Sequence, residues 1–131
     1  MTRAGEALRS AAAEALRSIP GVAVYDAPPV QAATPFVVVE AGPEADWSHN
    51  TGTGRELRLA VTVHDRGERP PRLDSLMEEG EAVLAGLGAS AVGWQLVTFR
   101  FLRSRVAPPQ AGAPNGLWTG LLEYRARMLA D

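Results

Sequence analysis

The stretch "RELRLAVTVH", Arg55 to His64, decides the fold. Apolar and polar residues alternate along it: one face holds Leu57, Leu59, Val61 and Val63, and the other holds Glu56, Arg58, Thr62 and His64. A period of two residues is the pattern of a β-strand with one buried and one exposed face, as in antiparallel sheets. The segment therefore predicts a sheet that packs its core on one side only.

Other segments predict neighbouring strands for this sheet. The segment "LWTGLLEYRARML", residues 117–129, alternates in the same way. One of its faces holds Trp118, Gly120, Leu122, Tyr124, Ala126 and Met128, and the other holds Glu123, Arg125 and Arg127. Residues 22–26, 35–41 and 94–106 are rich in β-branched and aromatic residues, which favours three further strands.

Two amphipathic segments predict helices. Residues 3–18 place alanine and leucine at helical spacing and end before Pro20-Gly21, and a second apolar stripe runs from Leu73 to Leu87. Gly80 lies within that stripe, so we expect the second helix to approach a neighbour closely there. The order is α-β-β-β-α-β-β. We therefore expect an α+β fold, a single domain over residues 1–131, with a mainly antiparallel sheet of about five strands and both helices on one face.

Composition excludes several classes of function. The chain has 131 residues, no cysteine and a net charge of −2, and every one of its 13 basic residues is arginine. Disulfides, thiolate zinc sites and lysine-dependent catalysis are thus excluded. The overall charge gives no attraction to nucleic acid, and no apolar run is long enough for a membrane span. The start of the chain lacks the apolar block of a signal peptide, which predicts a cytoplasmic origin.

The segment "DWSH" contains residue types that are found in active sites. Asp46, Ser48 and His49 are the types of a nucleophilic triad, but neighbours in sequence rarely reach the geometry that a triad requires. His49 and His64 are separated by a loop and a strand of roughly 30 Å, too far for one metal site within a single copy. We therefore predict no metal and no cofactor. A small metal- or ligand-binding enzyme that uses Asp46, His49 and His64 across an oligomer interface remains the alternative.

Two further patterns have a plain structural interpretation. "TGTGRE", residues 51–56, lacks the spacing of a phosphate-binding loop and leads into a strand, so we interpret it as a mobile loop. Arg100, Arg103 and Arg105 are interleaved with Phe99 and Phe101, as in strands that bind single-stranded nucleic acid. Core phenylalanines beside solvated arginines explain that pattern better, although these arginines are also suited to pairing with acidic residues of a neighbouring copy.

The whole pattern resembles the tail terminator, or tail-completion, proteins of long-tailed phages and phage-like gene transfer agents. The resemblance rests on the order and spacing of several segments: "LRSIPGVAVYDAPP", "TPFVVVE", "DWS", "GRELRLAVTVHDRG", "LVTFRFLRSRV" and "YRARM". It implies a non-enzymatic virion protein that forms a six-fold ring on the tail tube. The ring ends tube polymerisation and joins the tail to the head-side connector or stopper protein.

The resemblance also implies partners, a location and contact residues. The partners are further copies of the chain, the major tail tube protein and the connector, while DNA passes through the lumen without specific binding. The location is the tail neck of the virion, assembled in the bacterial cytoplasm, with no membrane involved. Another head-tail connector protein is the closest alternative. The candidate interface residues are Trp47, Ser48, His49, Arg55, Arg58, Arg100, Arg103, Pro109 and Asn115.

Overall fold

A computed structural model describes residues 2–67, 71–88, 90–111 and 116–131. Two helices and six strands follow in the order α1 (Ala4–Leu16), β1 (Ala23–Tyr25), β2 (Phe36–Asp46), β3 (Gly54–Arg66), α2 (Pro71–Ala85), β4 (Ser90–Ala91), β5 (Trp94–Ala107) and β6 (Leu117–Ala130). The predicted order is confirmed, with β4 as an added short strand. No helix in the described ranges is long and apolar enough to cross a membrane.

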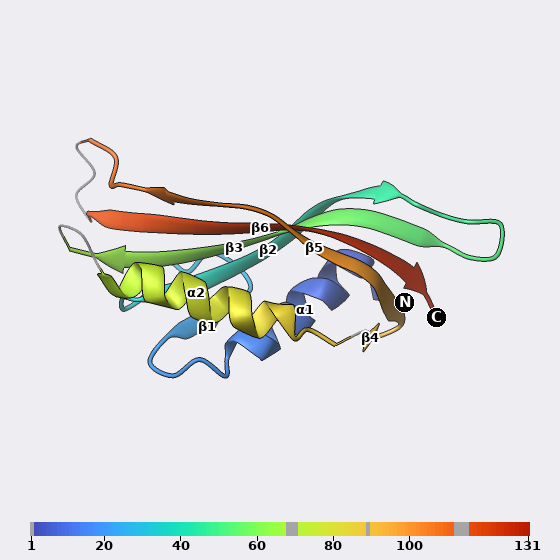
Figure 1. Cartoon of the computed structure of the whole chain (residues 1–131), viewed down its shortest axis with the longest axis horizontal. Helices are drawn as coiled ribbons and strands as arrows, with labels where there is room; N and C mark the ends of the chain where they lie inside the picture. The colour runs from blue at the N-terminus through green and yellow to red at the C-terminus, as the bar shows by residue number, and fades with distance from the viewer. Residues whose placement is uncertain (1, 68–70, 89, 112–115) are drawn as a thin grey trace.

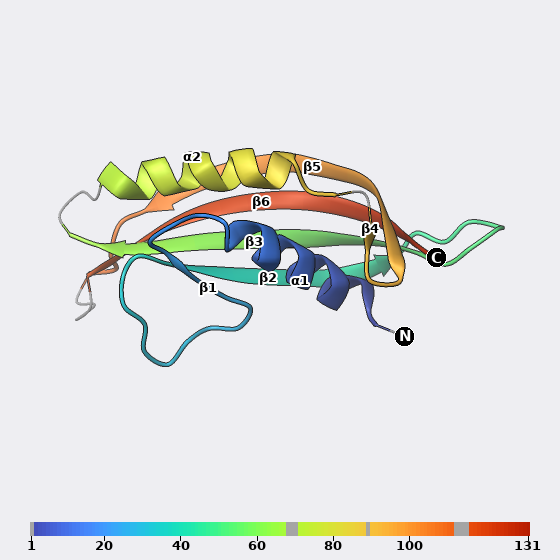
Figure 2. The same ribbon diagram turned by 90° about the horizontal axis from the view of Figure 1, so that it is seen from below.

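The strands form one curved sheet with both helices on the same side (Figures 1 and 2). The strand order is β1-β2-β3-β6-β5-β4, and every pair is antiparallel except β1 with β2. The predicted α+β fold is thus confirmed. The second strand is longer than its apolar run predicts, because a bulge between Ala41 and Glu44 lets it continue to Asp46.

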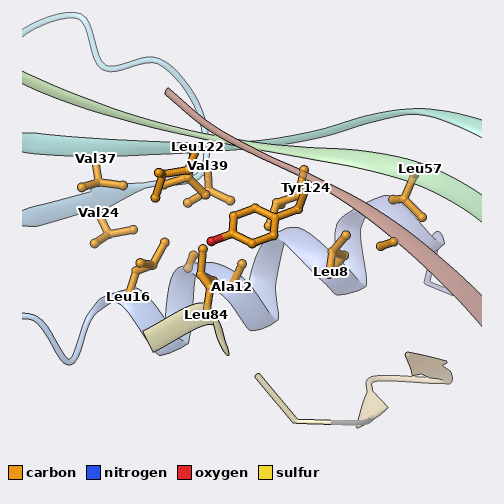
Figure 3. Packing of buried hydrophobic residues seen from close by; sticks show 14 of the residues in the cluster. Leu8, Ala12, Leu16, Val24, Val37, Val39, Leu57, Leu84, Leu122 and Tyr124 are labelled. Carbon is orange, nitrogen blue, oxygen red and sulfur yellow. The ribbon is translucent and has the colours of Figure 1, made fainter. Parts of the chain in front are cut away.

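The core lies between the helices and the centre of the sheet. β3 and β6 pair without interruption from Gly54 with Leu129 to Arg66 with Leu117, and their buried residues alternate as the sequence predicts. Figure 3 shows Leu8, Ala12 and Leu16 of α1 directed toward Val39, Leu122 and Tyr124 of the sheet. This face is apolar because it meets the helices, whereas the opposite face carries polar side chains together with the buried Phe36 and Val38 of β2.

Small residues bring the helices close to the sheet. Ala4, Ala7 and Ala12 of α1 are buried, and a Cβ atom at Gly80 of α2 would lie 3.3 Å from Leu122 Cδ1. That distance leaves little room for a side chain, so the close approach expected at position 80 is confirmed.

β5 departs from the predicted alternation. Register shifts between Leu96 and Thr98 and between Phe101 and Arg103 interrupt its pairing with β6. Phe99 stacks on Tyr124 with ring centroids 4.6 Å apart, but Phe101 is 42% exposed. The prediction that both phenylalanines belong to the core is therefore wrong for Phe101, because the sequence does not reveal where a bulge interrupts the period.

A buried ion pair fixes the start of α2 to the end of β3. Asp65 is fully buried; Arg72 Nη2 donates a hydrogen bond to its Oδ1 at 2.7 Å, and Arg72 Nε donates to its Oδ2. The backbone N–H of Arg66 donates to Oδ1 at 2.8 Å. These contacts, the Arg72 side chain first among them, lower the pKa of Asp65 below its ordinary value.

We predict that Asp65→Asn lowers the free energy of unfolding by about 2–3 kcal/mol, because the amide cannot accept both hydrogen bonds from Arg72. In the wild type, ionised Asp65 stabilises the fold above its ordinary pKa of 3.8. That contribution is lost as the pH falls through the lowered native pKa. Urea unfolding at neutral and acidic pH measures both effects. Asp26→Asn, at an exposed carboxylate, is the control. Equal stability of the two variants at pH 7 would contradict the prediction.

Candidate functional site: an arginine-rich sheet face between two end loops

The β2–β3 hairpin extends beyond the sheet and carries the segment that resembles catalytic machinery (Figure 1). Trp47 N donates to Gly54 O at 2.9 Å, and His49 and Gly52 exchange two backbone hydrogen bonds across the tip. A Cβ atom at Gly54 would lie 2.2 Å from Trp47 O, so only glycine permits this close approach. The segment expected to be a mobile loop is therefore a hydrogen-bonded hairpin end.

Side-chain contacts order the same hairpin. Ser48 Oγ donates to Asp46 Oδ1 at 2.6 Å and accepts from Gly54 N at 3.1 Å. The Ser48 hydrogen bond is the main cause that lowers the pKa of Asp46, and the charge of Arg55 adds to it. Asp46 thus orders the loop through Ser48, and no hydrogen bond joins His49 to the serine within the hairpin. This arrangement is structural and has no triad geometry.

The side chain of Trp47 is held in place by two residues of its own chain, His49 and Arg127. Its ring meets His49 edge to face with centroids 4.5 Å apart, and Arg127 Cζ lies 5.5 Å from its centre. A cation–π contact of this kind fixes the orientation of the indole while leaving it partly exposed. Because Arg127 belongs to the polar side of β6, Trp47 also lies on the face that the helices leave open.

That open face carries a group of arginines across three adjacent strands, which we call the arginine face. It consists of Arg58 of β3, Arg125 and Arg127 of β6, and Arg100, Arg103 and Arg105 of β5. Arg58 and Arg100 lie directly opposite Arg125 on either side, so three guanidinium groups share one row of the sheet. Like charges in opposite positions destabilise a sheet, so the row has a cost in stability.

Three glutamates on the same face balance only part of this charge. Glu123 pairs with both Arg58, at 3.3 Å, and Arg103, at 3.4 Å. Glu56 accepts a hydrogen bond from Arg127 at 2.8 Å, the main cause that lowers its pKa. The third acid, Glu40, lies on β2 opposite Ala60. Within the described ranges, no ion pair is formed by Arg100, Arg105 or Arg125.

The predicted interface residues fall into separate groups. Arg58, Arg100 and Arg103 come together on the arginine face, and Trp47 lies at its hairpin end. Arg55 lies beside Asp46 at the base of the same hairpin, with its Nη1 3.3 Å from Asp46 Oδ1. Pro109 is half-buried in the β5–β6 connection at the opposite end of the sheet, roughly 40 Å away along 13-residue β3. Asn115 lies outside the described residues.

The alternative site built on Asp46, His49 and His64 does not assemble within one copy. Asp46 and His49 belong to the hairpin end, whereas His64 stacks on Phe36 near the far end of β3, with centroids 4.7 Å apart. Burial lowers the pKa of His64, which keeps the imidazole neutral at pH 7. Among the residues that the structure places, no three His, Asp or Glu side chains form a group suited to a metal.

Sequence reasoning missed the outer edge of β5. β4 pairs only with Trp94 and Gln95, so no strand of the described chain covers that edge from Leu96 onward. Exposed apolar side chains follow it, with Val97 43% and Val106 42% exposed. The sequence does show apolar residues in this strand. Only the short length of β4 in the structure shows that they lie at an open edge of the sheet.

Comparisons with a protein-family profile and with solved structures agree with this architecture. No match was found among curated proteins. Among solved structures, the fold is similar to that of a chain in the virion of a native gene transfer agent particle. The TM-score is 0.78 at 25% sequence identity, and the match covers 98% of this chain and 100% of that chain.

The profile of the tail completion protein gp17 family matches residues 6–129, which include most of α1, all of α2 and the sheet as far as Leu129. The family expected from the sequence is thus confirmed. A match of this length shows that the chain belongs to the tail completion protein gp17 family, whose members are structural proteins and not enzymes.

Proposed function

We propose that this tail completion protein is a tail terminator, which forms a six-fold ring on the tail tube, ends tube polymerisation and joins the tail to the head-side connector or stopper protein. Its place is then the tail neck of a phage or gene transfer agent virion, after assembly in the bacterial cytoplasm. Family membership and the likeness to a virion chain support this proposal. The observation that best supports ring formation is the open outer edge of β5.

An open strand edge favours association with another chain. Backbone N–H and C=O groups along the outer side of β5 have no strand partner in the described chain beyond Gln95. Such an edge promotes pairing or packing against a further copy. Exposed Phe101 and Val106 give this edge an apolar character that suits a permanent contact.

A hollow beside the same edge adds apolar surface for that contact. It has a volume of about 550 Å³ and is lined by Glu81, Leu84, Ala85, Leu87, Leu96, Phe99, Phe101 and Tyr124. Burial, with Glu81 as a second cause, raises the pKa of Tyr124 to about 12, so its hydroxyl stays neutral at pH 7. Apart from Glu81, the lining is uncharged and mostly apolar, which suits an apolar side chain of the next copy.

The opposite edge of the sheet offers such a side chain. Val30, in the connection between β1 and β2, is fully exposed at 102%. Contact between two different edges is head-to-tail, and head-to-tail contacts build rings when their rotation closes. We therefore propose that the segment around Val30 packs on the β5 edge of the neighbouring copy.

The two ends of the sheet then serve the two neighbours of the ring. The hairpin with Trp47, Ser48, His49 and Arg55 lies at one end, and the start of the β5–β6 connection, with Pro109, lies at the other (Figure 1). A ring between a tube and a connector needs two such surfaces. We assign the hairpin end to the tail tube protein, since its ordered backbone presents a fixed surface, and the opposite end to the connector.

Particles that lack the protein are expected to carry overlong tails or tails without heads, because the growing end of the tube stays uncovered. Negative-stain electron microscopy of particles from a deletion strain measures tail length, with a complemented strain as the control. Tails of normal length that stop short of the head would instead indicate another head-tail connector protein. Normal joined particles would rule out both functions.

Val30→Asp and Val106→Asp are each expected to prevent ring formation, because either change places a carboxylate in an apolar contact. Ala82→Asp, at an exposed residue of α2 that does not line the hollow, adds the same charge and serves as the matched control. Native mass spectrometry of the purified proteins and tail length in particles measure the effect. If the Val30 and Val106 variants assemble as the control does, the head-to-tail contact is wrong.

Trp47→Ala and Arg55→Glu are expected to weaken attachment to the tail tube while the domain stays folded, since neither side chain belongs to the core. Co-sedimentation with tubes measures attachment, and thermal unfolding checks the fold. Arg17→Glu, at the exposed residue that follows α1, is the control for charge reversal. Unchanged attachment of both hairpin variants would remove the hairpin from the tube interface.

A further inference from the structure

We propose that the arginine face contacts the phosphate backbone of double-stranded DNA, so that this side of the sheet lines the DNA path of the particle. This inference rests on the proposed ring. The net charge of the chain is −2, which by itself gives no reason to expect binding to a polyanion. The tertiary structure changes this expectation, because it gathers charges of one sign on one surface.

The charge of the chain is strongly polarised. The six arginines of the arginine face and Glu40, Glu56 and Glu123 together carry +3. Since the whole chain carries −2, the remaining residues carry −5. A positive face on a protein of negative net charge is turned toward a polyanion by electrostatic attraction. Charges within a Debye length of about 8–10 Å of the polyanion act on it together, and more distant charges are screened.

The internal ion pairs leave part of the arginine face unneutralised. One carboxylate, Glu123, serves two arginines, and Arg100, Arg105 and Arg125 form no ion pair in the described ranges. Arg125 Nε is buried and has no hydrogen-bond partner among the residues described. A row of like charges destabilises the sheet, and an anionic partner that neutralises the row offsets this cost.

The shape of the arginine face favours DNA as the anionic partner. Three adjacent strands place Arg58, Arg125 and Arg100 in a row roughly 10 Å wide, and arginines two residues apart along a strand lie about 7 Å from each other. Double-stranded DNA carries one charge per 1.7 Å of its axis, so several phosphates lie within reach at once. Guanidinium groups bind phosphate through paired hydrogen bonds regardless of base sequence.

The test is binding of the full-length protein to a short labelled DNA duplex between about 50 and 200 mM salt. We expect sequence-independent binding that weakens steeply with salt. Arg100→Gln combined with Arg105→Gln is expected to weaken binding about tenfold and to reduce the slope of log K against log salt by about 2. Arg3→Gln combined with Arg17→Gln removes the same charge from exposed positions around α1 and is expected to leave binding within about twofold.

Three outcomes would overturn the proposal. The first is no DNA binding by the wild type at low salt, and the second is an equal loss of DNA affinity in both double variants. The third is normal DNA binding by the Arg100 and Arg105 variant together with failure to join heads. The last would assign the arginine face to an acidic protein surface. Particles that carry this variant are expected to have tails of normal length but reduced DNA delivery. The proposed ring is tested separately by tail length, so its failure is distinguishable from failure of the DNA contact.

Discussion

The pairing of β3 with β6 is the constraint on which the rest of the structure depends. Thirteen residue pairs run from one end of the sheet to the other without a bulge, so each side chain along both strands keeps its face. A shift of one residue would move leucines to solvent and arginines into the core. The same register therefore fixes the apolar surface that receives the helices and the row formed by Arg58 and Arg125 on the opposite side.

The two faces of this sheet have different roles. The helix side supplies stability through a continuous apolar core and through the ion pair of Asp65 with Arg72, which anchors α2. The other side contributes little apolar burial around its arginines and retains unfavourable neighbours of like charge. Natural sheets keep such features where they serve a function. The division gives this structural protein a specialised surface on the side that the helices leave open.

The ends and edges of the sheet complete this division. The hairpin at Trp47 is ordered by backbone and side-chain hydrogen bonds, so it presents a fixed shape at one end. The β5 edge exposes apolar side chains and unpaired backbone groups, which are features of a contact between chains. The ring that we propose requires a lateral contact and two axial contacts, and the three surfaces assigned to them lie in different places on this small fold.

The sequence by itself determined the order of helices and strands, the alternation of β3 and β6, and the close approach at Gly80, because these follow from local periodicity and residue size. It also showed the family, through the order and spacing of several segments. Only the tertiary structure decided that β5 is an open edge with Phe101 exposed, that Trp47 packs against Arg127, and that Arg58, Arg125 and Arg100 share one row. Those features depend on strand order, register and bulges, which join residues far apart in the chain and leave no local pattern in it.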